Sequence, residues 1–195
     1  MTTEQFRDFD EYREFVKFLA ENKISLDFPN SSSKHAAVVL ANIFETSKNV
    51  YIYDSNLKGD IAYEHEDFIN GLKNFCEKGD NNLYIILKSD KDLEKQKLYQ
   101  HIKTNKSDRN ANVKLFIHND DFKNSIIEAT KKEPFKINSN INFTVSDNAY
   151  RIERFDTPAK YDAVCNLYNP EKANILLSVV SNFIENNKLK EISFN

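Results

Sequence analysis

Apolar side chains recur at the three- and four-residue spacing of an amphipathic helix in six parts of the chain. In the stretch 4–22, Phe9, Tyr12, Phe15, Val16 and Leu19 fall on one helical face and predict a helix that packs on a core. The same spacing predicts helices over 34–47, 66–77, 90–103, 120–130 and from Pro170 to about residue 185. One of the serines Ser31–Ser33, and Asn169 before the last helix, are suitable N-cap residues.

Short apolar stretches between these helices predict β-strands at 49–53, 83–87 and 113–117. The stretch Leu83–Leu87 is apolar throughout, which suits a strand covered on both faces of a parallel sheet. From Ile137 the pattern alternates, and it predicts antiparallel strands at about 141–145, 150–153 and 162–168. A polar loop is expected over Thr104–Asn112 and a polar tail from Asn186.

The order of these elements predicts an α/β fold with a mixed β-sheet flanked by helices on both faces. No internal repeat, long linker or low-complexity segment divides the chain. We therefore expect a single domain over residues 1–195, with an N-terminal helical extension over about residues 1–30.

The composition is that of a globular protein outside the membrane. Of its 195 residues 40% are hydrophobic, yet no apolar run approaches the ~20 residues that span a bilayer. The first residues lack the basic start and apolar run of a secretion signal, so we expect a cytoplasmic location. Cys76 and Cys165 each lie within an apolar pattern and predict two buried thiols rather than a disulfide.

Charge and glycine content narrow the range of functions. A formal net charge of −3 does not favour a general nucleic-acid binder, because phosphate neutralisation needs clustered Lys and Arg. Three glycines leave no room for a glycine-rich phosphate loop, and we expect no cofactor. Glu64–Asp67 contains four potential metal ligands in a row, but neighbours in sequence do not share a helix face. Acidic residues in a first turn are explained by the helix dipole, so no metal site is expected.

The strongest functional pattern lies in the predicted hairpin. Asn140, Asn142 and Asp147 stand at positions i, i+2 and i+7 of a strand and its turn. Asp147-Asn148 is a turn dipeptide, and Tyr150–Glu153 is the predicted returning strand.

This spacing resembles the His-x-Lys-x-x-x-x-Asp motif of the phospholipase D superfamily. The stretch Cys165–Glu171, which runs into the last helix, is similar to the family's second conserved stretch, and the likeness covers roughly residues 33–185. The resemblance implies a phospholipase D-like fold with a single copy of the motif. In that family the histidine attacks phosphorus to give a phospho-enzyme, and the lysine neutralises the phosphate oxygens.

Two of the three motif residues are replaced in this chain. Asn140 stands at the histidine position, where an amide cannot act as a nucleophile, and Asn142 at the lysine position carries no charge. Asp147 matches, although plain turn chemistry also selects aspartate there. We therefore expect no catalytic residue in the motif and a binding site made of Asn140, Asn142, Asp147, Arg151 and Glu153.

Arg151 and Glu153 share one strand face, which gives two interpretations. The favoured one is an ion pair on the sheet surface, and the other is that Arg151 binds a phosphate or a partner's carboxylate bidentately. Of the histidines His35, His65, His101 and His118, the last is best placed for a site at the sheet edge, because it directly follows a predicted strand.

The leading functional interpretation is a non-catalytic interaction or regulatory module. The resemblance implies a homodimer, because single-copy members set two motifs across a two-fold axis, with a seam near Asn140–Glu153 or the last helix. A protein partner is expected and a membrane is not, and the habits of the family suggest a bacterial defence or toxin-control system.

Two alternatives stay open. One is a phosphodiesterase or nuclease with a rebuilt active site on His118 or His65. The other is a binder of nucleotides or nucleic acid that uses Arg151, Arg154 and lysines without cleavage.

Overall fold

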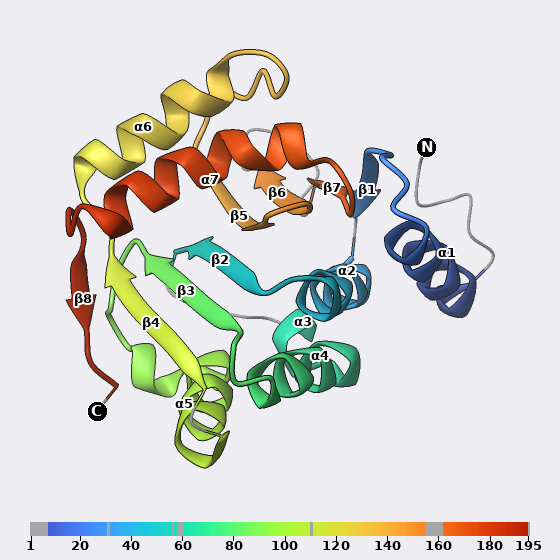
Figure 1. Cartoon of the computed structure of the whole chain (residues 1–195), viewed down its shortest axis with the longest axis horizontal. Helices are drawn as coiled ribbons and strands as arrows, with labels where there is room; N and C mark the ends of the chain where they lie inside the picture. Colours follow the sequence, from blue (N-terminus) through green and yellow to red (C-terminus); the bar gives the residue numbers. More distant parts are fainter. Residues whose placement is uncertain are drawn as a thin grey trace.

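One open eight-stranded β-sheet with helices on both faces forms the centre of the molecule (Figure 1). The computed structural model describes residues 8–30, 32–55, 57, 61–109, 111–154 and 162–194. The strand order is β1-β7-β6-β5-β2-β3-β4-β8, with parallel and antiparallel neighbours. The expected α/β class with a mixed sheet is confirmed.

Three parallel strands form one half of the sheet. They are β2 (Asn49–Asp54), β3 (Asn82–Leu87) and β4 (Asn112–Ile117), paired in register from Asn49 opposite Asn82 to Leu87 opposite Ile117. Helices α3 (Ile61–Glu64) and α4 (Glu66–Glu77) connect β2 to β3, and η2 (Leu93–Lys95) with α5 (Lys97–Arg109) connects β3 to β4. This alternation of strand and helix brings the carboxyl ends of all three strands to the same edge of the sheet.

The other half is antiparallel. Strand β5 (Ile141–Ser146) pairs with β2, and β6 (Tyr150–Arg154), β7 (Asp162–Asn166) and β1 (Phe28–Asn30) follow in turn. The hairpin between β5 and β6 turns at Asp147-Asn148, as its sequence predicts, and Ser146 N donates to Ala149 O at 2.9 Å. At the opposite edge β8 (Lys190–Ile192) pairs antiparallel with β4.

The helices divide between the two faces (Figure 1). Helices α2 (Ser33–Thr46), α4 and α5 cover one face, and α1 (Phe9–Glu21) packs against α2; α6 (Asp120–Lys131) and α7 (Pro170–Glu185) cover the other. Ser32 and Asn169 cap α2 and α7 through side-chain hydrogen bonds, as predicted. The N-terminal segment contributes Tyr12 and Val16 to the first core and β1 to the sheet edge.

Two elements differ from the sequence expectation. Helix α5 begins at Lys97 instead of at the expected residue 90, because the short 3-10 helix η2 precedes it. It continues to Arg109 through the stretch expected as a polar loop, and Asn105 Nδ2 and Lys106 Nζ bind carbonyl oxygens of His101 and Val113. Strand β8 lies in the expected polar tail. Its short polar sequence carries no strand signal of its own, and it forms by pairing with the edge of β4.

Cys76 and Cys165 are buried free thiols, as predicted. Among the helices of the described residues, none combines the length and apolar character that a membrane span requires.

A close approach of α2 and α4 gives a test of the packing. A Cβ atom on Gly71 would lie 2.8 Å from Ala41 Cα, whereas a Cβ on Gly79 would meet no heavy atom within 4 Å. Overpacking costs about 1–3 kcal/mol, and the gain in helix propensity from glycine to alanine is at most about 1 kcal/mol. We therefore expect Gly71→Ala to lower the free energy of unfolding by about 1 kcal/mol in urea denaturation. Gly79→Ala is the matched control, and equal stability of the two variants would refute the packing described here.

Candidate functional site

The carboxyl ends of β2, β3 and β4 form the wall of a cavity of about 410 Å³. Backbone ladders fix this edge: Lys88 N donates to Asp54 O at 3.0 Å, and His118 N donates to Leu87 O at 2.9 Å. Each parallel strand thus delivers a polar side chain to the edge where ligands bind in open α/β sheets. The lining residues are Tyr53, Ser55, Lys88, His118, Asp120, Lys123 and Asn140.

His118 and Tyr53 form a hydrogen-bonded pair in this cavity. Tyr53 Oη lies 2.9 Å from His118 Nδ1, and which of the two donates depends on the imidazole tautomer. Burial lowers the pKa of His118, and the charges of Lys88 and Lys123 lower it further, against a smaller opposing effect of Asp120. Both effects favour the neutral imidazole over the imidazolium form.

Lys88 connects the cavity to the hairpin. Its Nζ donates to Asn142 Oδ1 at 2.8 Å and to Ile141 O at 3.1 Å, and lies 5.0 Å from the centre of the Tyr53 ring. Burial lowers the pKa of Lys88, and the carboxylates of Asp54 and Glu153 act in the opposite direction. The ammonium group thus lies beside the amide that stands at the lysine position of the motif.

A chain of polar contacts continues from Asn142 across β6 to β1. Asn142 Nδ2 donates to Glu153 Oε2 at 3.4 Å, and Arg151 pairs with Glu153 Oε1 at 3.4 Å. Arg151 Nε donates to Asn30 Oδ1 at 2.7 Å. The side chains of Arg151 and Glu153 are only 12% and 20% exposed, so their ion pair lies largely inside the molecule.

The five residues expected at the binding site fall into separate places. Asn142, Arg151 and Glu153 meet in the polar chain, and Asn140 is exposed in the cavity wall. Asp147 lies at the hairpin turn, five residues beyond Asn142 and so about 17 Å away along an extended strand. The amide positions of the motif therefore share one sheet edge, and Asp147 belongs to the other.

Sequence reasoning missed Tyr53, Lys88 and Lys123. Lys88 directly follows the buried strand β3, just as His118 directly follows β4. The rule that singled out His118, namely a polar residue at the carboxyl end of a parallel strand, also applies to Lys88. Lys123 lies one turn into α6, and only the packing of that helix brings it to the cavity.

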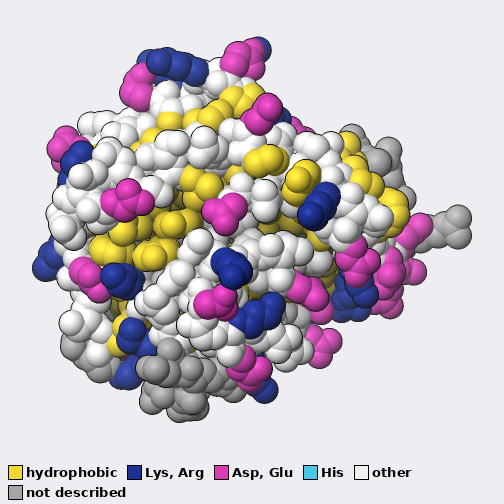
Figure 2. Space-filling view, viewed as in Figure 1, with side chains coloured by type: hydrophobic (Ala, Val, Ile, Leu, Met, Phe, Trp, Pro, Cys, Tyr) yellow, Lys and Arg dark blue, Asp and Glu magenta, His cyan; other side chains and the backbone are white. Residues whose placement is uncertain are grey.

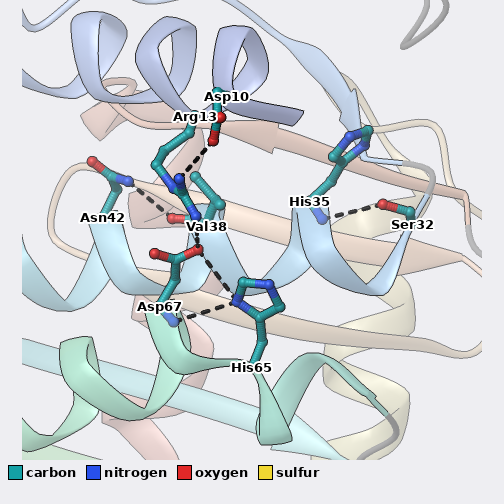
Figure 3. Close-up of polar contacts among 8 residues, drawn as sticks. All are labelled: Asp10, Arg13, Ser32, His35, Val38, Asn42, His65 and Asp67. Carbon is teal, nitrogen blue, oxygen red and sulfur yellow. Dashed lines mark hydrogen bonds and ion pairs between the residues drawn. The ribbon is translucent and has the colours of Figure 1, made fainter. Parts of the chain in front are cut away.

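The histidines at the helix starts have structural roles (Figure 3). His65 Nδ1 accepts from Asp67 N at 3.3 Å and so caps α4, while Asp67 pairs with Arg13 of α1 at 3.0 Å. The ring of His35 stacks on Tyr12 with centroids 3.9 Å apart. Neither histidine lines the cavity described above. Within the part of the chain that the structure describes, no three His, Cys, Asp or Glu side chains gather as metal ligands.

Comparison with protein-family models gives no match to this chain, and the search of curated proteins finds no significantly similar sequence.

The largely buried ion pair between Arg151 and Glu153 gives a test of the polar chain. Glu153→Gln removes the charge that compensates Arg151, and we expect a loss of about 2–3 kcal/mol in the free energy of unfolding. Glu128→Gln is the matched control, because Glu128 and Lys131 pair at an exposed site where such pairs contribute about 0–1 kcal/mol. The double variant Arg151→Met with Glu153→Leu should regain much of the loss. Equal effects of the two Glu→Gln substitutions in urea denaturation would contradict the role given to the pair.

Proposed function

We propose that this chain is a phospholipase D-like protein that has lost the catalytic motif and binds a phosphate-bearing ligand at the motif edge, as a binding or regulatory module. The observation that carries the proposal is the position of Lys88, whose Nζ lies 2.8 Å from Asn142 Oδ1. A lysine from β3 thus supplies a positive charge beside the position where the motif would place one.

Three features support the phospholipase D-like assignment. The strand and turn that carry the Asn140, Asn142 and Asp147 frame form a β-hairpin next to the parallel strands. The stretch after β7 leads into α7, which begins with an Asn169 cap and a first-turn proline. A helix start at this place matches the family's second conserved stretch, to which Cys165–Glu171 is similar. Asn140 also lines a cavity at the carboxyl edge of the parallel strands, where α/β sheets bind ligands, and Asn142 contacts Lys88 of the cavity wall.

The charges around the cavity favour an anion. Lys88, Lys123 and His118 lie close enough for each lysine to lower the pKa of the imidazole, and Lys123 also lowers the pKa of Lys88. The two ammonium groups thus repel each other, and the carboxylates of Asp54 and Glu153 near Lys88 and of Asp120 near His118 act in the opposite direction. A phosphate group would relieve this repulsion and accept charge-assisted hydrogen bonds from both ammonium groups. The exposed amide of Asn140 and the hydroxyl of Ser55 offer neutral donors to the same ligand.

The chemistry of the motif positions supports binding without turnover. Asn140 cannot form a covalent intermediate with phosphorus. Both amide atoms of Asn142 are used within the chain, by Lys88 and Glu153. The homodimer and the protein partner that the resemblance implies belong to the same proposal, and Asn140, which is exposed at this edge, is the motif position that a second copy would reach.

The binding prediction is tested with inorganic phosphate, nucleoside monophosphates, and short DNA and RNA strands as probes, in isothermal titration calorimetry. We expect Lys88→Met and Lys123→Met each to weaken binding about tenfold, because each removes one charge-assisted hydrogen bond. Binding of the wild type should also weaken as the salt concentration rises.

Lys73→Met is the matched control for the loss of one positive charge, because Lys73 is exposed on α4 and does not line the cavity. Thermal unfolding of each variant separates a loss of binding from a loss of fold. Equal binding by Lys73→Met, Lys88→Met and Lys123→Met would overturn the proposed site.

One observation favours a second candidate, a phosphodiesterase with a rebuilt active site. Burial and the two neighbouring lysines lower the pKa of His118 and so favour its neutral form, and if its Nδ1 donates to Tyr53 Oη, its Nε2 carries a lone pair. Nε2 would then form a bond to phosphorus while an alkoxide leaves with the electron pair of the broken P–O bond and takes a proton from solvent. Water would attack the phospho-enzyme, and the P–N bond would break with its electron pair returning to Nε2. In the other tautomer Nε2 is protonated and this step is blocked.

Incubation with bis-p-nitrophenyl phosphate separates the two functions. We expect no release of nitrophenolate above background, because no residue of the motif can act as the nucleophile. If the wild type does turn over, His118→Ala and His101→Ala distinguish the cause. Turnover that is lost in the first variant and kept in the second would replace the binding function with the catalytic one.

A further inference from the structure

A half-buried pair of tyrosines lies on the sheet face that α6 and α7 cover, toward the amino ends of the strands. Tyr51 of β2 is the register partner of Tyr84 of β3, and the two rings stack with centroids 4.8 Å apart and planes 10° apart. Both rings pack against the core beneath α7 and stay partly exposed. Figure 2 shows apolar side chains gathered below α7 in a hollow over the strands, with acidic side chains at its border.

One flank of α7 borders this hollow. Ser181 of α7 lies near enough to the hydroxyl of Tyr51 to lower its pKa, which shows the side of the helix that faces the tyrosines. Leu177 and Ile184 lie four residues before and three residues after Ser181, on the same side of the helix, and both are partly exposed. The sheet and the helix thus present a continuous apolar surface made of Tyr51, Tyr84, Leu177 and Ile184, which we name the tyrosine surface.

The border of the tyrosine surface is acidic on the side of α7 and the β5–β6 hairpin, whereas Lys114 of β4, the register partner of Tyr84, is exposed on the other side. Burial raises the pKa of Tyr51, and the neighbouring charges of Asp147 and Glu185 raise it further. Asp147 and Glu171 also line an adjoining hollow of about 420 Å³ together with Leu177. All three carboxylates are exposed, and no basic side chain in the described parts of the chain forms an ion pair with them.

We propose that the tyrosine surface binds a segment of a partner protein that presents apolar side chains flanked by Lys or Arg. Apolar side chains of the segment would cover the stacked rings, and its basic side chains would neutralise Asp147, Glu171 and Glu185. The surface lies toward the amino ends of β2 and β3, whereas the anion cavity lies at their carboxyl ends, so the two sites are made of different residues.

A second copy of the chain fits this surface less well. Among the described residues Phe18 is the one large hydrophobic residue classed as exposed, with 55% of its surface accessible. Glu14 and Glu21, four residues before it and three after it, lie beside Phe18 on α1. These carboxylates would repel the acidic border of the tyrosine surface.

The test uses two short synthetic peptides of equal length, one alternating Leu with Lys and the other alternating Leu with Glu. In a titration followed by ¹H–¹⁵N NMR we expect the basic peptide to shift the resonances of Tyr51, Tyr84 and Ile184, and the acidic peptide to shift none of them. Asp147→Lys with Glu185→Lys should weaken binding of the basic peptide at least about tenfold. The control Glu14→Lys with Glu45→Lys changes the net charge equally at exposed sites elsewhere and should leave binding unchanged.

Tyr84→Ser tests the apolar part of the surface and should weaken the basic peptide by a similar factor. Three outcomes would overturn the proposal. The first is that both charge-reversal double variants weaken binding of the basic peptide equally. The second is that the basic peptide shifts resonances of residues in other parts of the chain. The third is that the free wild type sediments as a dimer and Tyr84→Ser as a monomer, which would make a second copy the occupant.

Discussion

The antiparallel pairing of β5 with β2 is the constraint on which the candidate site depends. Strand β2 pairs in parallel with β3 on one side and antiparallel with β5 on the other. The beginning of β5, with Asn140 and Asn142, therefore lies at the same edge as the ends of β2, β3 and β4. The hydrogen bond from Lys88, which follows β3, to Asn142 of β5 links the parallel and antiparallel halves of the sheet at this edge. If β5 ran parallel to β2, the amide positions would lie at the opposite edge, far from Lys88 and His118.

The polar groups at this edge lower the stability of the fold relative to apolar packing, and in the proposed function they bind the anion. A buried pair such as Arg151 and Glu153 contributes less than well-packed apolar side chains of the same size would. It does hold Asn142 in place, and Asn142 in turn fixes the ammonium group of Lys88 at the cavity wall. Partial burial disfavours the charged forms of Lys88 and His118 and so lowers their pKa values. A bound anion would favour the charged forms again. In the proposed function, this polar chain would hold Lys88 in place for an anion before the anion binds.

Much of this arrangement could be read from the sequence, and the rest depends on long-range packing. Helical spacing and the capping residues Ser32 and Asn169 predict α2 and α7 closely, because those signals are local. The hairpin at Asp147 follows from alternation and turn chemistry. Strand β8 could not be predicted from the sequence, because its residues form a strand only by pairing with the edge strand β4. The frame of Asn140, Asn142 and Asp147 predicted part of the site, whereas Lys88 and Lys123 come from elements far away in the chain.

The titration of His118 tests the central claim most directly. Without ligand, NMR should give an imidazole pKa below its ordinary value, because burial and the charges of Lys88 and Lys123 disfavour the protonated form. With saturating dimethyl phosphate, a diester that keeps one negative charge across the whole range, the pKa of His118 should rise, because a bound anion favours the imidazolium form. In Lys88→Met the same rise should require a diester concentration about tenfold higher, because the anion binds more weakly. A titration curve of His118 that is the same with and without the diester would contradict the account.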